Sequence, residues 1–166
     1  KWFAKKIGFN DFSGGIAASG GTLSNLNALI AARNNAGLGT NPNSVLLVSE
    51  DAHSSFIKCI RVMGLDSTNL VRIKTDNEGC IDIQNLRKTL DKCSIDNKKI
   101  FAIVATLGTT VRGAIDPIKD ISKICKEKDI WLHIDGSIGG IFALTSFPIE
   151  GLNNINQANS ITINPQ

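Results

Sequence analysis

Short apolar runs alternate with longer amphipathic stretches along most of the chain, and this alternation constrains the fold more than any other feature. The expected strands are residues 45–48, 70–73, 100–105, 130–134 and 160–163. The expected helices between them are residues 22–35, 54–63, 82–90 and 117–126. Nearly continuous apolarity is typical of strands that are covered on both faces of a parallel sheet. The sequence therefore predicts an α/β domain, with a mostly parallel sheet flanked by helices.

Glycine, proline and aspartate mark the expected ends of several helices. Gly37 and Gly64 follow two of the amphipathic stretches, where a glycine favours the left-handed turn that ends a helix. Asp116 precedes Pro117, and this pair predicts a helix start with Asp116 as the N-cap acceptor.

Composition excludes several classes of function. The net charge is +3, and the basic residues are dispersed among acidic ones, so nucleic-acid binding is not expected. No apolar run reaches the roughly 18 residues of a membrane span, and the first residues do not form a signal sequence. The four cysteines lack a CxxC spacing, which favours free thiols over a metal site. We expect a cytoplasmic protein without a metal or a membrane anchor.

Polar residues follow three of the expected strands, and a fourth polar segment precedes a helix. Parallel sheets bind ligands at the carboxyl ends of their strands, so these positions are the first candidates for a site. Gly20, Gly21 and Thr22 lead into a helix and could bind an anion, or could form only a turn and a cap. Asp135 ends the strand 130–134, on the same face as His133, and could bind a ligand or simply cap a helix. The nearby Gly136, Gly139 and Gly140 would let a ligand approach the backbone.

Two further segments are weaker taken alone. His53 follows the strand 45–48 and could be a cap as readily as a functional side chain. Thr106, Thr109 and Thr110 follow the strand 100–105, where hydroxyl groups bind ligands or close turns.

Together these segments resemble the group II pyridoxal-phosphate-dependent amino-acid decarboxylases, which act on aromatic amino acids, glutamate, cysteine sulfinate, diaminobutyrate and others. The resemblance rests on Ser-Gly-Gly-Thr-x-Ser-Asn-Leu, Ala-His-Ser-Ser, Ala-Thr-x-Gly-Thr-Thr-x-x-Gly-Ala-x-Asp-Pro, Trp-Leu-His-Ile-Asp-Gly and Asn-Pro, in this order. It runs from about Gly14 to Gln166 and implies that residues 1–166 are part of the large, cofactor-binding domain of a fold-type-I enzyme. An N-terminal segment, a smaller C-terminal domain and a homodimer are implied as well.

The resemblance also implies roles for individual residues. Gly20, Gly21 and Thr22 would bind the phosphate of pyridoxal 5'-phosphate. Asp135 would pair with the ring nitrogen, and His53 would stack on the ring, so the catalytic roles fall to these two. His133 would support Asp135.

Four more positions match the cofactor site of the family, and two of them depart from its usual residues. Thr110 would lie near the ring substituents, and Asn164 belongs to the Asn-Pro motif. Ser137 stands where alanine is common, and Gln166 where histidine is common. The lysine that forms the Schiff base would be expected directly after Gln166.

The implied reaction is decarboxylation of an L-amino acid to an amine and carbon dioxide. Three alternatives stay open at this point. The chain could belong to another fold-type-I enzyme, such as an aldehyde lyase or an aminotransferase. It could be a catalytically inactive homologue that acts as a binding or structural subunit. It could also be an unrelated α/β nucleotide-binding domain, although it contains neither GxGxxG nor a P-loop motif.

Overall fold

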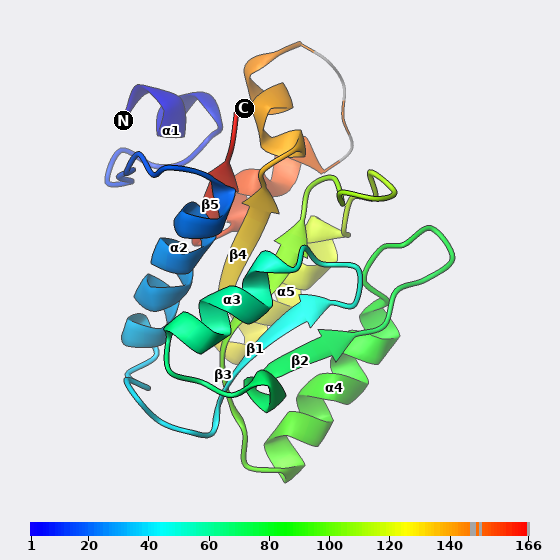
Figure 1. Cartoon of the computed structure of the whole chain (residues 1–166). Helices are drawn as coiled ribbons and strands as arrows, with labels where there is room; N and C mark the ends of the chain where they lie inside the picture. The colour runs from blue at the N-terminus through cyan, green and yellow to red at the C-terminus, as the bar shows by residue number, and fades with distance from the viewer. Residues whose placement is uncertain (147–148, 150, 166) are drawn as a thin grey trace.

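A five-stranded sheet forms the centre of the computed structural model, which describes residues 1–146, 149 and 151–165 (Figure 1). Its strands are β1 (Ser44–Ser49), β2 (Leu70–Ile73), β3 (Lys99–Thr106), β4 (Trp131–Gly136) and β5 (Ser160–Ile163). They lie in the order β2-β1-β3-β4-β5, and every neighbouring pair is parallel. The prediction of an α/β domain with a parallel sheet is therefore confirmed, and all five expected strands are present.

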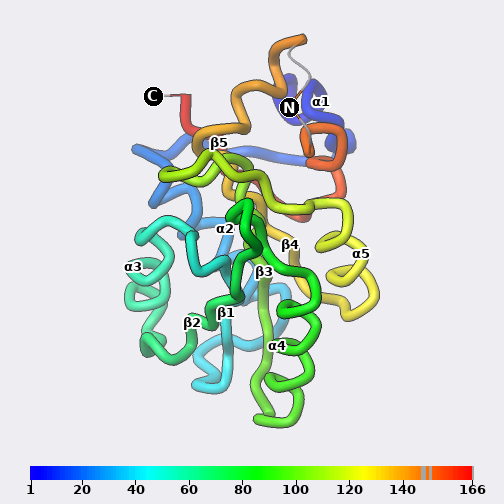
Figure 2. The backbone as a smooth tube through the Cα atoms, turned by 90° about the vertical axis from the view of Figure 1, so that its right-hand side faces the viewer, coloured from blue at the N-terminus to red at the C-terminus, as the bar shows by residue number. Residues whose placement is uncertain are grey.

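Helices cover both faces of this sheet. The α-helices are α1 (Trp2–Lys6), α2 (Gly21–Asn35), α3 (Ser55–Val62), α4 (Ile83–Ile95) and α5 (Ile118–Lys128). Three short 3-10 helices are η1 (Ser67–Asn69), η2 (Gly139–Leu144) and η3 (Leu152–Gln157). Figures 1 and 2 show α2 and α3 on one face and α4 and α5 on the other. Helix α4 continues five residues beyond its expected end, and α1 was not predicted.

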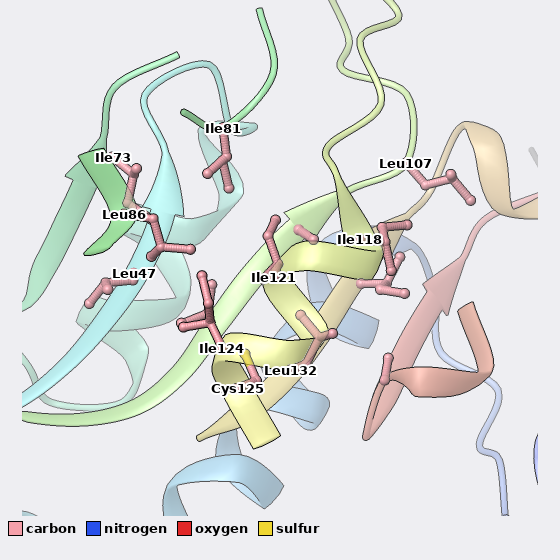
Figure 3. Close-up of a cluster of buried hydrophobic side chains, with 14 of the residues drawn as sticks. Leu47, Ile73, Ile81, Leu86, Leu107, Ile118, Ile121, Ile124, Cys125 and Leu132 are labelled. Carbon is pink, nitrogen blue, oxygen red and sulfur yellow. The ribbon is translucent and has the colours of Figure 1, made fainter. Parts of the chain in front are cut away.

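The strands separate the core into two clusters, because successive side chains of a strand point to opposite faces. In β1, Leu46 and Val48 pack with α2 and α3, whereas Val45 and Leu47 pack with α4 and α5. Figure 3 shows the second cluster, in which Ile121 and Ile124 of α5 lie between the sheet and the helix. Fully burying one such side chain contributes about 1.5–3 kcal/mol. The strand ends are thus fixed from both sides.

The expected glycine helix ends are confirmed. Gly37 has a φ of 65° and Gly64 a φ of 73°, and each directly follows the C-cap residue of its helix. The amides beyond them, Leu38 N and Leu65 N, donate to Arg33 O and Ile60 O and so close the last turns.

The predicted N-cap role of Asp116 is wrong. Helix α5 begins at Ile118 with Pro117 as its N-cap residue, and no side chain caps it. The Asp116 carboxylate accepts hydrogen bonds from Ile81 N at 2.7 Å and from Thr106 N at 2.6 Å instead. These two amides lie in separate segments, so Asp116 joins the end of β3 to the loop before α4. Because Pro117 is the N-cap residue, Asp116 lies one residue before the capping position, and its carboxylate binds backbone donors of other segments instead.

Candidate active site

A pocket of about 250 Å³ lies at the carboxyl ends of β3, β4 and β5, beside the start of α2. Seven of the predicted site residues line it, namely Gly21, Thr22, His53, Thr110, Asp135, Ser137 and Asn164. Its other described lining residues are Asn25, Ser55, Thr106, Gly108, Thr109 and Ile138. Gly20 does not line the pocket but is the N-cap residue of α2, and Gln166 lies outside the described residues.

The pocket side of α2 offers uncapped backbone donors. Gly20 has no side chain to cap the helix, and the first turn contains no acidic residue. The first amides of a helix have no carbonyl partner within it, and the helix dipole makes this end partly positive. Because Gly21 and Thr22 line the pocket, these donors suit an anionic group there.

Gly21 allows three segments to approach one another closely. A Cβ added at Gly21 would lie 2.8 Å from Ser137 Oγ and 3.9 Å from Asn164 Cβ. Contacts below 3.0 Å force a shift, so a larger residue would push the Ser137 hydroxyl out of its hydrogen bond to Asp135. The glycine at this position is therefore a packing requirement of the pocket wall.

Asp135 is held in the pocket by donors from two directions. Its side chain is buried at 5% exposure. Oδ1 accepts from Ser137 Oγ at 2.6 Å and from Ser137 N at 3.2 Å, while Oδ2 accepts from Asn25 Nδ2 at 3.1 Å. These bonds fix the carboxylate in one orientation.

A chain of buried and partly buried hydrogen bonds continues from Asn25 away from the pocket. His133 Nε2 lies 3.1 Å from Asn25 Oδ1, and His133 Nδ1 lies 2.8 Å from Ser160 Oγ. Ser160 Oγ also accepts from Trp131 Nε1 at 2.8 Å. We call these five residues, Trp131, Ser160, His133, Asn25 and Asp135, the Asp135 relay. The structure links His133 to Asp135 through Asn25, and the supporting role of His133 stays a prediction.

The direction of every bond in the Asp135 relay follows from its two ends. The Asp135 carboxylate can only accept, so Asn25 donates to it through Nδ2 and accepts from His133 Nε2 through Oδ1. Nδ1 of a neutral His133 ring then accepts from the Ser160 hydroxyl, which itself accepts from the indole N–H of Trp131. Burial lowers the pKa of His133 to about 4, although the Asp135 charge opposes this shift. The neutral ring therefore carries its proton on Nε2 and donates to Asn25 Oδ1. The Asn25 amide then presents its N–H to Asp135.

His53 lies at the mouth of the pocket, in the turn between β1 and α3, and its residue is exposed. Its Nδ1 accepts a hydrogen bond from Ser55 N at 3.2 Å. This bond leaves Nε2 as the N–H donor of the neutral ring. The hydrogen bond thus fixes the ring at Nδ1, while the edge that carries Nε2 can face a ligand.

The glycines after Asp135 do not serve the expected purpose. None of Gly136, Gly139 and Gly140 is a lining residue of the pocket. A Cβ at Gly139 would lie 2.3 Å from Leu107 O, one at Gly140 2.7 Å from Ile163 Cγ1, and one at Gly136 2.9 Å from Thr162 O. Protein atoms occupy the space that we expected a ligand to use, because η2 folds directly against the ends of β3 and β5.

The threonines after β3 divide into two environments. Thr109 is buried, and its hydroxyl accepts from Ala114 N at 3.0 Å, which closes the loop from Gly108 to Ala114. Thr110 is exposed at the pocket mouth. Arg112 of the same loop forms an ion pair with Asp51 of the turn after β1, with 3.4 Å between Nε and Oδ2, and this pair joins the two loops.

Sequence reasoning missed Asn25, Ser55, Gly108 and Ile138 as lining residues, and named Thr106 and Thr109 only as hydroxyls at a strand end. Asn25 lies three residues after Thr22 on the same helix and so on the same face, which is the signal that could have identified it. Ser55 and Thr106 stood in the motifs but received no separate role. Within the described part of the chain, no helix has the length and apolarity that a membrane crossing requires. Nor do three or more His, Cys, Asp or Glu side chains gather there in a way that could hold a metal ion.

Comparison with known proteins identifies the family. A model of the pyridoxal-dependent decarboxylase conserved domain matches residues 1–166. An aromatic-L-amino-acid decarboxylase of Bacillus atrophaeus is 33% identical over 164 residues, which are 99% of this chain and 34% of that protein. The acidic amino acid decarboxylase GADL1 of Homo sapiens is 32% identical over 158 residues, which are 91% of this chain and 30% of that protein.

Solved structures agree. The crystal structure of mouse CSAD in apo form has a TM-score of 0.91 at 29% identity, with 99% of this chain and 36% of that chain covered. Catharanthus roseus tryptophan decarboxylase in complex with L-tryptophan has a TM-score of 0.88 at 27% identity, with 98% of this chain and 37% of that chain covered. The expected fold-type-I architecture is confirmed. The chain spans about a third of the length of these relatives, and it belongs to the family of pyridoxal-dependent decarboxylases.

Proposed function

We propose that the protein containing this chain decarboxylates an L-amino acid to an amine and carbon dioxide, with pyridoxal 5'-phosphate bound in the pocket beside Asp135. The observation that carries the proposal is the fixed Asp135 carboxylate at the strand ends, opposite the uncapped start of α2. This arrangement offers a negative group and an anion-binding helix end in the same pocket. A ligand that joins a cationic ring to a phosphate would complement both, with the ring at the carboxylate and the phosphate at the helix end.

The side chains of the pocket fit this cofactor. The described lining residues include no lysine or arginine, so the phosphate would be bound by backbone N–H groups and hydroxyls. We assign Gly20, Gly21 and Thr22 to the phosphate. The close packing of Gly21 against Ser137 and Asn164 gives the pocket a rigid wall at this end.

When bound, pyridoxal phosphate supplies an electron-accepting ring that stabilises the negative charge left on the α carbon as carbon dioxide departs. Asp135 would hold a proton on the ring nitrogen, because an adjacent carboxylate favours the protonated form. The Asp135 relay would keep the carboxylate aimed at this proton. Prealignment of this kind lowers the barrier without further ordering during the reaction.

His53 and Ser137 would contact the two faces of the ring. The bond from Ser55 N orients the His53 ring and leaves its Nε2–H available to a substrate carboxylate. Ser137 would pack with its Cβ while its hydroxyl stays bonded to Asp135, which gives the serine a function that alanine lacks. Thr110 and Asn164 would lie near the ring substituents and the phosphate, and we extend this assignment to Gln166.

We also propose that residues 1–166 form part of the large domain of a cytoplasmic homodimer. The exposed apolar side chains of Phe12, Ile16 and Val111, at 99%, 73% and 91% exposure, are consistent with contacts to further protein. The small amino-acid substrate would reach the pocket from its open mouth.

An assay of reaction products tests the function. The purified protein would be incubated with aromatic and acidic L-amino acids and with L-2,4-diaminobutyrate, with and without added pyridoxal phosphate. We expect carbon dioxide and the matching amine in equal amounts from one substrate class, dependent on the cofactor. Keto acid or aldehyde without amine would identify another fold-type-I reaction. Cofactor binding without any product would identify an inactive homologue.

A further inference from the structure

Two buried hydroxyl groups in the pocket wall have no hydrogen-bond partner. Among the residues that the structure describes, five buried side-chain polar atoms are unpaired, and three of them are hydroxyls, on Ser44, Ser55 and Thr106. Ser55 is 2% exposed and Thr106 is 6% exposed, and both line the pocket. A buried hydroxyl without a partner has lost its bonds to water and gained none in return, so such groups call for an explanation.

The other hydroxyls of the pocket do not share this property. Ser137 Oγ donates to Asp135, and Thr109 Oγ1 accepts from Ala114 N. Thr22 and Thr110 are exposed and can bond to water. Only the Ser55 and Thr106 hydroxyls, of those on the described lining residues, are both buried and unpaired.

The backbone around both residues is fixed by hydrogen bonds. Ser55 N donates to His53 Nδ1, and Thr106 N donates to Asp116 Oδ2. Thr106 is also in register with Asp135 on the neighbouring strand, so both side chains project from the same face at the same level. The two hydroxyls are therefore held in place beside the residues to which we assign the ring.

We propose that the hydroxyls of Ser55 and Thr106 hydrogen bond to the bound pyridoxal phosphate and are further binding residues of its site. This inference rests on the proposed function. Hydroxyls both donate and accept, which suits the oxygen-rich substituents of the cofactor. The protein keeps two unpaired groups in the free state, and the cofactor pairs them when it binds.

The proposal predicts opposite effects on stability and on binding. Ser55→Ala and Thr106→Val each remove an unpaired hydroxyl, so the cofactor-free protein should unfold at the same or a higher temperature. The same variants should bind pyridoxal phosphate roughly 3- to 10-fold more weakly, the loss of one hydrogen bond of about 0.5–1.5 kcal/mol. Thr106→Ser, which keeps the hydroxyl, should bind nearly as tightly as the wild type.

Ser44→Ala is the matched control. Ser44 is fully buried, and its hydroxyl is also unpaired, but it lies at the first residue of β1, at the opposite end of the strand from the pocket. This variant should keep or gain stability and leave the dissociation constant for pyridoxal phosphate unchanged.

The experiment measures thermal unfolding of the cofactor-free protein and equilibrium binding of pyridoxal phosphate for the wild type and the four variants. Weaker binding in Ser55→Ala and Thr106→Val but not in Ser44→Ala supports the inference. Unchanged binding in both pocket variants overturns it and leaves the proposed function intact. A clear loss of stability in the cofactor-free pocket variants also overturns it, because the hydroxyls would then have protein partners. No binding by the wild type overturns both the inference and the proposed function.

Discussion

Asp135 and Asp116 are buried carboxylates on either side of the last residue of β3, yet their surroundings differ. Asp116, 2% exposed, accepts from two backbone amides, and one of these is Thr106 N. Asp135, 5% exposed, pairs in register with Thr106, accepts from the side chains of Asn25 and Ser137, and lines the pocket. Backbone donors make Asp116 part of the scaffold, whereas side-chain donors and access to the pocket make Asp135 available to a ligand.

The comparison predicts that replacing Asp135 lowers activity, whereas replacing Asp116 lowers stability. Asp135→Asn should lower kcat by about 10²- to 10³-fold, the range found when one electrostatic contact to a transition state is lost. Cofactor affinity should fall by a smaller factor, because the phosphate contacts are unaffected. Steady-state kinetics and equilibrium binding measure the two quantities. A kcat within threefold of the wild type would remove Asp135 from the catalytic machinery.

Asp116→Asn should instead act on stability. An amide has one acceptor oxygen for the two N–H groups of Ile81 and Thr106, so one buried donor loses its partner. We expect a loss of about 1–3 kcal/mol in the free energy of unfolding, measured by urea denaturation at pH 7. The kcat of the folded variant should stay within about threefold of the wild type. Equal stability of the two proteins would contradict the structural role.

The pH dependence sharpens this difference. Burial raises the pKa of Asp116 to about 6 from an ordinary value of 3.8. Between these values the folded protein binds a proton that the unfolded chain has released, so the contribution of Asp116 favours folding at pH 4 and is lost as the pH rises through 6. The stability difference between the wild type and Asp116→Asn should therefore shrink from pH 4 to pH 7, by at most about 1.4 kcal/mol per pH unit.

His133 has the opposite sign and serves as the internal reference. Its pKa is lowered to about 4 from 6.5, so its contribution is present above pH 6.5 and is lost as the pH falls through 4. Both proteins retain His133, and its effect cancels in the difference between them. A stability difference that grows from pH 4 to pH 7 would show that Asp116 does not titrate in this way.

The smallest effect is expected at the far end of the Asp135 relay. In Trp131→Phe the Ser160 hydroxyl loses the indole donor that orients it, so its hydrogen bond to His133 Nδ1 weakens and the Nδ1 chemical shift changes. The proton stays on Nε2 because Asn25 Oδ1 accepts it. We expect a two- to fivefold lower kcat, by analogy with the loss of one hydrogen bond. The ¹⁵N spectrum of histidine-labelled protein, assigned with His133→Gln, measures the tautomer directly. A wild-type His133 that carries its proton on Nδ1 would contradict the relay, as would a variant with an unchanged spectrum.

Local patterns predicted the parts of the molecule that depend on local physics. The five strands and four main helices follow from hydrophobic periodicity, and the helix ends at Gly37 and Gly64 follow from the conformational freedom of glycine. The family motifs, in their order along the chain, predicted residues that line the pocket. Such motifs occur at strand ends that contribute to one site. These predictions needed no knowledge of distant contacts.

Contacts between distant segments could not be predicted in the same way. Asn25 and Asp135 are 110 residues apart, and only the folded sheet brings the amide to the carboxylate. Asp116 was assigned to a helix cap because its neighbours in sequence suggested one, while its partners come from Ile81 and Thr106. Gly139 was expected to leave room for a ligand, but Leu107, from another strand end, fills the space beside it.

The protonation state of the bound ring nitrogen tests the account most directly. Pyridoxal phosphate labelled with ¹⁵N at the ring would be bound to the wild type and to Asp135→Asn, and the ¹⁵N chemical shift would be measured at neutral pH. We predict a protonated nitrogen in the wild type and an unprotonated nitrogen in the variant. An unprotonated nitrogen in the wild type, or the same shift in both proteins, would show that Asp135 does not pair with the ring.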